Sequence, residues 1–388
     1  MTTESTKRFI PLAEPDLSSL EESLLIEALR SGWISSIGHF IGEFEEQFAR
    51  FCEADCAVAV SNGTAALDLA LMAARVGPGD EVIVPALTFI AVAAAVRHVG
   101  AVPVFVDSEP NIGTMDPEAV KTAITPRTKA IIPVHLYGHP ADMDPIMDLA
   151  EKHGAVVIED AAEAHGARYK GRRVGSIGHL ATFSFYGNKI ITTGEGGMVL
   201  TNSLELAQRI RFLRDHAMDP ARRYWHSEVG YNFRLTNLQA AIGCAQLRRY
   251  DELIAKRKTM ISRYRDAFSG MPLIAINPSR PWAELAPWLA CAILPEGTTR
   301  LMNEGLRMSL RDQGFDTRPY FIPGNLMPPY DKCRVVSRFG AGCPVASALS
   351  ERGLNLPSPN WLTAEDIGLL RNATAAYMDG LARLGSEL

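Results

Sequence analysis

The feature that most constrains the fold is a regular alternation of short apolar runs with helix-like segments between residues 57 and 201. The apolar runs are rich in β-branched residues and occupy residues 81–86, 102–107, 130–138, 155–160, 181–187 and 197–201. Stretches with helical periodicity, such as residues 64–76 and 144–154, separate them. Strands that lack a polar face and are joined through helices form a mostly parallel sheet, which helices cover on both sides. The alternation therefore predicts an α/β fold.

The length of the chain, 388 residues, exceeds what one compact core accommodates and predicts two domains. We expect residues 1–270 to contain the N-terminal segment and a large domain built on the parallel sheet. From residue 271 the sequence is less regular and richer in Pro, which predicts a smaller α+β domain over residues 271–388. The elements expected in it are a strand near 289–297 and helices near 298–313 and 364–385.

The segment DLSSLEESLLIEALRSG, residues 16–32, predicts an amphipathic helix near the N-terminus. Its leucines recur at helical spacing, Asp16 can cap the first turn and Gly32 can end the last. We therefore expect a helix there that turns one apolar face toward the protein.

The charge and cysteine content argue against several classes of partner. With 39 basic and 44 acidic side chains the formal net charge is −5, which offers no broad attraction to nucleic acid or to an anionic membrane. No apolar run approaches the roughly 18 residues that cross a bilayer, and we expect a cytoplasmic protein. The six cysteines are scattered, and only Cys52 and Cys56 lie close together, without a second pair or a His cluster. We expect packing roles for them and no metal site.

The residues at the carboxyl ends of the strands are the first candidates for a site, because ligands of parallel α/β sheets bind there. Ser61, Asn62, Gly63 and Thr64 stand where a strand turns into a helix. The free N–H groups and the dipole of a helix N-terminus suit a phosphate. A plain helix cap is the other interpretation of the same residues.

Two carboxylates, Glu159 and Asp160, end a second strand. Such a carboxylate is either an N-cap for the following helix or a buried anion that faces a ligand cation. Glu163 and His165 follow near the same helix N-terminus, where a single His is more often structural than functional. Both interpretations of the carboxylates stay open at this point.

Lys189 follows the strand ATFSFYG and precedes a loop made largely of Thr and Gly. Most lysines are solvated, but a lysine in a partly dry site loses its proton and becomes a nucleophile. The sequence is neither a P-loop nor a dinucleotide fingerprint, because GNKI lacks the Gly-Lys-Ser/Thr order and no Gly-x-Gly-x-x-Gly opens a helix. A phosphate cradle, an acid for a pyridinium N–H and an amine for a Schiff base are what pyridoxal phosphate (PLP) requires. The strand ends together therefore predict a PLP site.

The motifs SNGTAALDLAL, IEDAAEAHGA, FSFYGNKIITTGEGG and GYNFRLTNLQAAIG resemble the DegT/StrS family of PLP-dependent nucleotide-sugar aminotransferases. The resemblance spans nearly the whole chain and implies the fold-type I architecture, with a large PLP domain and a smaller C-terminal domain. The segments GWISSIGHFIGEFE and LMPPY look closest to members that aminate C4 of a GDP-linked 4-keto-6-deoxymannose. The resemblance implies glutamate as the amino donor and pyridoxamine phosphate as the amino carrier.

The resemblance also implies roles for the matching residues. Lys189 would form the Schiff base with the cofactor and then act as the proton-transfer base, and Asp160 would pair with the pyridinium nitrogen. The other implied cofactor contacts are Glu163 at the ring hydroxyl, Phe89 on the ring face, and Gly63, Thr64 and Ser184 at the phosphate. Asn232 matches a residue that reaches the phosphate from the neighbouring subunit, which implies a homodimer with shared active sites.

On the substrate side, the implied contacts are Trp33, Ser35, Asn188 and Asn325. Many members of the family carry His where this chain has Asn325. Arg222 and Arg223 either meet a diphosphate or form a solvated charge pair. A 3-dehydrase branch replaces the Schiff-base lysine by His, and Lys189 argues against that branch. Two alternatives stay open: the same chemistry on a dTDP- or UDP-linked keto sugar, and a non-catalytic regulator built on this fold.

Overall fold

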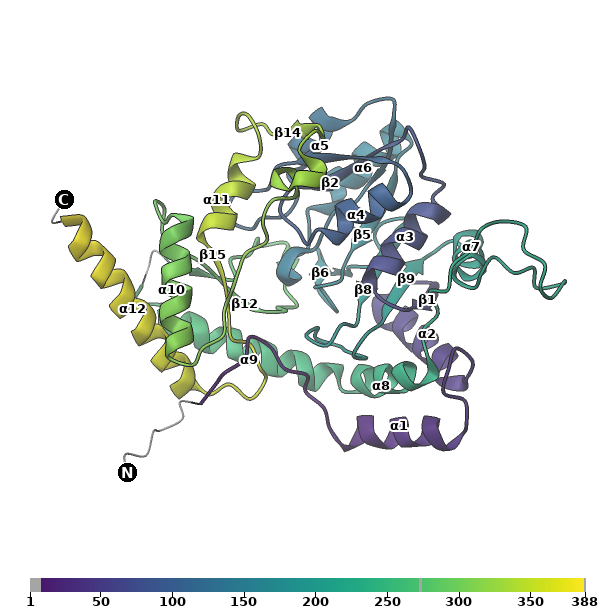
Figure 1. Ribbon diagram of the computed structural model, residues 1–388, viewed down its shortest axis with the longest axis horizontal. Helices are drawn as coiled ribbons and strands as arrows, with labels where there is room; N and C mark the ends of the chain where they lie inside the picture. Colours follow the sequence, from purple (N-terminus) through teal and green to yellow (C-terminus); the bar gives the residue numbers. More distant parts are fainter. Residues whose placement is uncertain (1–7, 272–273, 387–388) are drawn as a thin grey trace.

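The computed structural model describes residues 8–271 and 274–386, and an eight-stranded sheet forms its centre (Figure 1). In spatial order the strands are β1 (Cys56–Val60), β9 (Gly197–Thr201), β8 (Leu180–Ser184), β5 (Val156–Asp160), β4 (Thr128–Ile131), β2 (Glu81–Pro85), β3 (Val102–Val106) and β14 (Val335–Val336). Strand β9 is antiparallel to both neighbours, whereas all other neighbouring pairs are parallel. The predicted α/β fold with a mostly parallel sheet is confirmed.

Both faces of the sheet are buried, which explains why the strands lack a polar face. Val58 and Val60 of β1 belong to the core on one side, whereas Ala57 and Ala59 belong to the core on the other. The first side is covered by α3 (Gly63–Ala73), α4 (Ala91–His98) and α7 (Leu204–Arg214), and the second by α2 (His39–Cys52), α5 (Pro117–Ala123), α6 (Met143–His153) and α8 (Asn237–Arg248). Each large aliphatic side chain buried in this way contributes roughly 1.5–3 kcal/mol.

The segment 130–138 is shorter as a strand than its apolar run predicts. After β4 ends, Leu136–Gly138 form a 3-10 turn in which Tyr137 has a φ of 52°. Pro133 has no N–H to continue the ladder, although its carbonyl oxygen accepts a hydrogen bond from the N–H of Asp160 at 2.9 Å. The regular ladder is therefore interrupted at Pro133, and an isolated bridge between Val134 and Asp160 follows before the chain turns across the end of β5.

The N-terminal helix α1 (Ser19–Arg30) is capped by Ser18, so the prediction that Asp16 caps it is wrong. Ser18 and Glu21 form a capping box in which Glu21 Oε2 accepts a hydrogen bond from the Ser18 N–H at 2.7 Å. The Asp16 carboxylate instead accepts a hydrogen bond from Arg249 at 2.8 Å. The Asp16 side chain, which the local pattern assigned to the cap, thus forms a long-range ion pair instead.

The chain beyond residue 270 builds a small antiparallel sheet flanked by long helices. The strands, in spatial order, are β10 (Ala275–Ile276), β12 (Ala290–Ile293), β15 (Gly353–Leu356) and β13 (Arg318–Pro319). The helices of this part are α10 (Arg300–Asp312) and α12 (Ala364–Ser386), and α9 (Tyr250–Phe268), which precedes residue 270, shares their core. The expected strand near 289–297 and helices near 298–313 and 364–385 are therefore present. Strand β14 joins the large sheet, and α11 (Pro344–Arg352) packs on the core of that sheet. The division at residue 270 stays a prediction.

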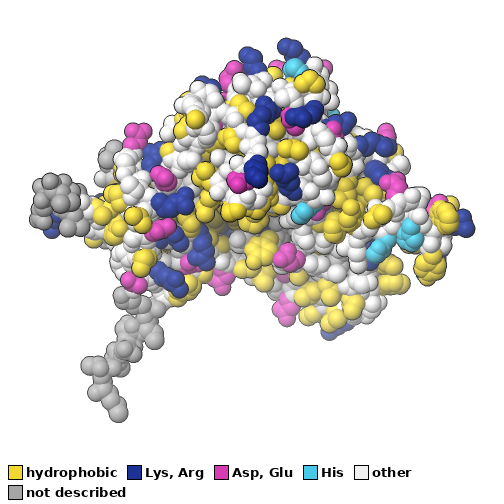
Figure 2. All heavy atoms as spheres, turned by 45° about the horizontal axis from the view of Figure 1, so that its top comes forward, with side chains coloured by type: hydrophobic (Ala, Val, Ile, Leu, Met, Phe, Trp, Pro, Cys, Tyr) yellow, Lys and Arg dark blue, Asp and Glu magenta, His cyan; other side chains and the backbone are white. Residues whose placement is uncertain are grey.

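The remaining elements lie around these two sheets. They are β6 (Arg168–Tyr169), β7 (Arg172–Arg173) and β11 (Ala283–Glu284), which pair with one another, and the 3-10 turns η2 (Gly324–Leu326) and η3 (Pro328–Tyr330). Residues 215–236 form an irregular excursion between α7 and α8 that projects from the body of the molecule (Figure 1). Figure 2 shows acidic and basic side chains interspersed over one face. Within residues 8–271 and 274–386, no helix is long and apolar enough to cross a membrane.

Candidate active site

The predicted site residues gather where strands β5 and β8 end and helix α3 begins. Asp160 is the last residue of β5, and Ser184 is the last residue of β8. Gly197 of β9 pairs with both Ser184 and Val60, which brings the end of β8 next to the turn into α3. The site therefore lies at the carboxyl edge of the parallel strands, where the topology places ligands.

The turn before α3 has the features of a phosphate cradle. Asn62 caps the helix, since its Oδ1 accepts a hydrogen bond from the Ala65 N–H at 2.8 Å. The N–H groups of Gly63 and Thr64 lie in the first turn and have no carbonyl partner in the helix. A Cβ at Gly63 would lie only 2.9 Å from Ser184 Cβ, so the two segments approach this closely only with Gly. The cap and the anion site are thus compatible features of one turn.

Lys189 lies in the turn that follows β8, and its side chain is only 10% exposed. Its Nζ lies 3.9 Å from Glu163 Oε1 and 3.7 Å from the centre of the Trp288 ring. Burial lowers the pKa of Lys189, although the charges of Glu163 and Asp160 oppose the shift. Lys189 is therefore not a solvated surface lysine but a buried amine that loses its proton more readily than usual.

Two buried carboxylates lie near this amine, and burial raises the pKa of each. The pKa of Glu163 rises to about 7, and that of Asp160 also rises, although the charge of Lys189 opposes both shifts. Asp160 Oδ1 accepts a hydrogen bond from the Ala162 N–H at 3.0 Å, and Glu163 Oε2 accepts one from the Tyr137 N–H at 2.8 Å. A buried carboxylate with four lone pairs can accept further bonds, and a ligand N–H or O–H group would supply them.

Glu159 has a different role from its neighbour Asp160, since strand residues next to each other face opposite sides. Its oxygens accept hydrogen bonds from His135 Nε2 at 3.0 Å and from the N–H groups of Gly175, Ile177 and Gly178 at 2.9, 2.8 and 2.7 Å. His135 Nδ1 accepts a hydrogen bond from the Ala141 N–H at 3.0 Å, which places the imidazole proton on Nε2. Glu159 is therefore an anchor for residues 175–178, a role that the sequence pattern did not indicate.

His165 is a structural residue, as is usual for a single His. It is buried beside the rings of Phe183 and Phe185, at 5.5 and 5.6 Å between centroids. Burial lowers its pKa to about 3, because the charged form would lose its hydration. The imidazole is therefore neutral at ordinary pH.

An aromatic wall, formed by Phe89, Tyr137, Trp288 and Phe321, stands over the site. The Phe89 ring is 57% exposed and lies 5.8 Å from the Phe321 ring, which stacks on Tyr137 at 5.3 Å and 12°. Trp288 Nε1 donates a hydrogen bond to the carbonyl oxygen of Asn188 at 2.7 Å. Sequence reasoning missed Tyr137, Trp288 and Phe321, because no local pattern connects these distant segments.

The predicted substrate residues fall into two groups. Asn188 and Asn325 each have a buried side-chain oxygen that, within the described residues, has no hydrogen-bond partner. Trp33 and Ser35 are exposed on the loop between α1 and α2, and their carbonyl oxygens accept hydrogen bonds from Asn237 at 2.7 and 2.6 Å. The two Asn side chains thus offer unused polar atoms, whereas the α1–α2 loop presents an exposed surface.

Asn232 is exposed on the excursion between α7 and α8. The neighbouring Phe233 carbonyl oxygen accepts a hydrogen bond from the Ser61 N–H at 2.9 Å, so the excursion returns beside the phosphate cradle. Arg222 lies at the outer part of the excursion with its guanidinium 4.1 Å from the centre of the Trp225 ring. Within the described chain, no hydrogen bond joins Asn232 to Lys189 or to residues 61–64.

Comparisons with known proteins find relatives along nearly the whole chain. The model of the DegT/DnrJ/EryC1/StrS aminotransferase family matches residues 15–372. GDP-perosamine synthase of Caulobacter vibrioides is 46% identical over 364 residues, which cover 92% of this chain and 95% of that protein. GDP-perosamine synthase of Escherichia coli O157:H7 is 42% identical and covers 93% and 96%, respectively. The Spr1654 protein of Streptococcus pneumoniae in its PMP form superimposes with a TM-score of 0.90 at 29% identity, covering 97% and 100%, and its PLP form gives 0.88.

Proposed function

Because the chain belongs to the DegT/DnrJ/EryC1/StrS aminotransferase family, whose members are PLP-dependent enzymes acting on sugars, we propose that it makes GDP-perosamine. The reaction would move the amino group of glutamate to C4 of a GDP-linked 4-keto-6-deoxymannose. Two GDP-perosamine synthases at 46% and 42% identity over more than nine-tenths of the chain support this choice of sugar. The observation that carries the proposal is the buried Lys189 amine between two carboxylates and beside a phosphate cradle.

The residues at the site fit the cofactor group by group. The free N–H groups of Gly63 and Thr64, with Ser184 beside them, would hold its phosphate. Asp160, buried with its pKa raised, gains a cationic partner when a pyridinium N–H meets its free oxygen. Phe89 offers an exposed ring face for stacking.

Lys189 would do the proton work of both half-reactions. When bound, PLP supplies an aldehyde carbon for the amine to capture and a ring that withdraws electrons from the bond being broken. Burial lowers the pKa of the Lys189 amine, which favours the unprotonated form that can take a proton from the donor Cα and later deliver one to C4 of the sugar. Glu163 lies 3.9 Å from Nζ and holds the amine in place, while Trp288 covers the amine and excludes water.

We propose that the working unit is a homodimer with shared active sites. Asn232 is exposed, and its backbone lies next to Phe233, which contacts the edge of the cradle. Asn232 lies at the base of the excursion, where it bridges to Asp215, and the rest of the excursion projects from the body of its own chain (Figure 1). A neighbouring subunit that packs against this excursion would bring its cofactor phosphate to the exposed Asn232 side chain.

The proposed reaction is tested by mixing the PLP-loaded protein with glutamate and GDP-4-keto-6-deoxymannose and following both products by mass spectrometry. Continuous formation of 2-oxoglutarate together with a GDP-amino sugar is the expected result. A single equivalent of 2-oxoglutarate with an unchanged GDP sugar would retain the aminotransferase and reject this sugar. In that event the same assay with dTDP- and UDP-linked keto sugars identifies the acceptor, and Lys189→Ala serves as the inactive control.

A further inference from the structure

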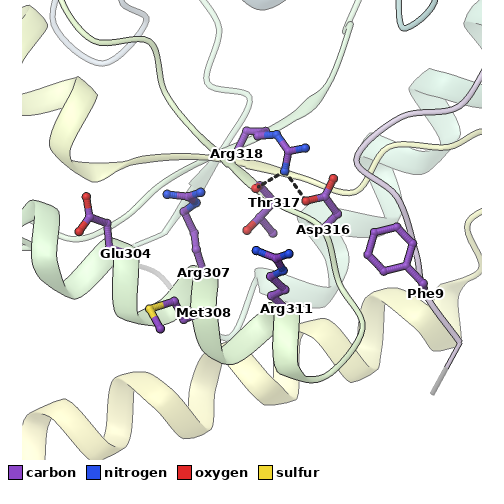
Figure 3. Close-up of a pocket in the computed structure, with 8 residues that line it drawn as sticks. All are labelled: Phe9, Glu304, Arg307, Met308, Arg311, Asp316, Thr317 and Arg318. Atoms are coloured by element: carbon purple, nitrogen blue, oxygen red, sulfur yellow. Dashed lines mark hydrogen bonds and ion pairs between the residues drawn. The ribbon is translucent and has the colours of Figure 1, made fainter. Parts of the chain in front are cut away.

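A hollow of about 640 Å³ lies on the small sheet side of the molecule, away from the Lys189 site. It is bounded by helix α10, by the chain entering strand β13 and by the N-terminal segment at Phe9 (Figure 3). Its lining residues are Phe9, Glu304, Arg307, Met308, Arg311, Asp316, Thr317 and Arg318. None of these residues contributes to the phosphate cradle, the carboxylates or the aromatic wall described above.

The chemistry of this hollow is set by three guanidinium groups. Figure 3 shows Arg307 and Arg311 rising from α10 toward Arg318 on the facing strand. The two helix arginines are four residues apart on one face, where like charges repel each other. Burial lowers the pKa of Arg307, and the charge of Arg318 lowers it further, although Glu304 and Asp316 oppose the shift. The three guanidinium groups therefore lie close together although their charges repel one another, an arrangement that a bound anion would stabilise.

The two carboxylates in the hollow leave much of this charge unpaired. Asp316 forms its ion pair with Arg318, and Glu304 is exposed on the helix. The guanidinium groups of Arg307 and Arg311 form no hydrogen bond or ion pair with another described residue, and Arg307 Nε is buried without a partner. A buried N–H without an acceptor is unfavourable, and a bound oxyanion would supply the missing acceptor.

We propose that this hollow binds the phosphate or diphosphate group of a small molecule through Arg307, Arg311 and Arg318. The planar guanidinium fork matches phosphate oxygens two at a time, and three such forks from two elements can surround one group. Phe9, which is 60% exposed at the rim, offers an apolar face to whatever carries the phosphate. This site is separate from the cofactor phosphate, and the inference does not depend on the identity of the sugar substrate.

The test is calorimetric titration of the PLP-loaded protein with pyrophosphate at low ionic strength. We expect saturable binding in the range below about 1 mM, weakened at least about tenfold by Arg311→Ala and by Arg307→Met, since each removes a charged hydrogen-bond donor. Arg300→Ala is the matched control, because it removes an exposed arginine from the same helix outside the hollow. Added salt should weaken binding to the unmodified protein.

The source of the phosphate is distinguished by titrating inorganic phosphate and GDP in parallel. If Arg311→Ala weakens the binding of pyrophosphate and of GDP by the same factor, the ligand is a nucleotide. If it weakens only the binding of the inorganic ions, the ligand is a free anion. Absence of pyrophosphate binding up to about 5 mM, or binding equally strong in Arg311→Ala and Arg300→Ala, overturns the proposal. The Arg311 side chain is exposed and has no hydrogen-bond or ion-pair partner in the described chain, so we expect Arg311→Ala to fold even if Arg307→Met does not.

Discussion

Replacing Glu159 by Gln should destabilise the protein without removing any group from the proposed chemistry. Each Glu159 oxygen accepts hydrogen bonds from two donors: Ile177 and Gly178 on Oε1, and His135 and Gly175 on Oε2. A Gln NH₂ group in either orientation faces two donors. His135 cannot turn its Nε2 into an acceptor, because its Nδ1 already accepts from a backbone N–H. Two buried donors left unpaired cost about 1–3 kcal/mol each, which gives about 2–6 kcal/mol in total.

This loss is measured as the free energy of unfolding of the cofactor-free protein in urea, followed by circular dichroism. Glu151→Gln is the matched control, because Glu151 is exposed near the end of α6, and we expect a change within about 0.5 kcal/mol. A destabilisation of Glu159→Gln below about 1 kcal/mol would refute the reasoning, since it would mean that the carboxylate does not anchor residues 175–178. Retained PLP binding by the variant would separate the structural effect from damage to the site.

Three further changes test the electrostatics of the site and of the N-terminal ion pairs. Asp160→Asn should lower turnover by orders of magnitude while leaving the fold intact, as checked by steady-state rates and circular dichroism; near-normal turnover would make Asp160 only a cap. Burial raises the pKa of Glu163 from 4.5 to about 7, so the cofactor-free protein should lose stability as the pH rises through that interval. Glu163→Gln should flatten that part of the curve of unfolding free energy against pH, and an unchanged slope would contradict the assignment. Although burial opposes the shift, hydrogen bonds from Lys256, Asn360 and Arg249 lower the pKa of Asp16 from 3.8 to about 2. The stability that Asp16 provides should therefore be present above pH 3.8 and be lost toward pH 2, and thermal melts of Asp16→Asn should converge with those of the unmodified protein there.

The sheet was predictable from the sequence because a strand buried on both faces consists almost entirely of apolar residues. Every residue of β2 is buried, and accordingly the run EVIVP has no polar residue after its first position. The placement of Asp160 and Lys189 at one edge was predictable for a related reason: Asp160 ends such a strand, Lys189 lies in the turn after another, and the topology decides which edge the strand ends share.

The contacts that the sequence did not reveal join segments far apart in the chain. Trp288 covers Lys189 from a region without regular periodicity. Tyr137 donates its N–H to Glu163 from a backbone conformation with positive φ, which no sequence pattern indicates. The cap of α1 was misassigned for a different reason. The S-x-x-E signature of Ser18 and Glu21 was present, but the acidic residue before it was the more conspicuous candidate.

One side chain, Asn237, connects two loops that are candidates for contact with the sugar nucleotide. It holds the carbonyl oxygens of Trp33 and Ser35 and accepts a hydrogen bond from the Phe40 N–H at 3.1 Å, and it directly follows the excursion that carries Asn232. A Cβ at Gly38 would lie 2.2 Å from Asn237 Cγ, so the fit tolerates no larger residue. Chimeras that exchange substrate preference between relatives should therefore replace residues 33–40 and 215–237 together. Replacing only one segment would disrupt the hydrogen bonds that Asn237 makes to the other.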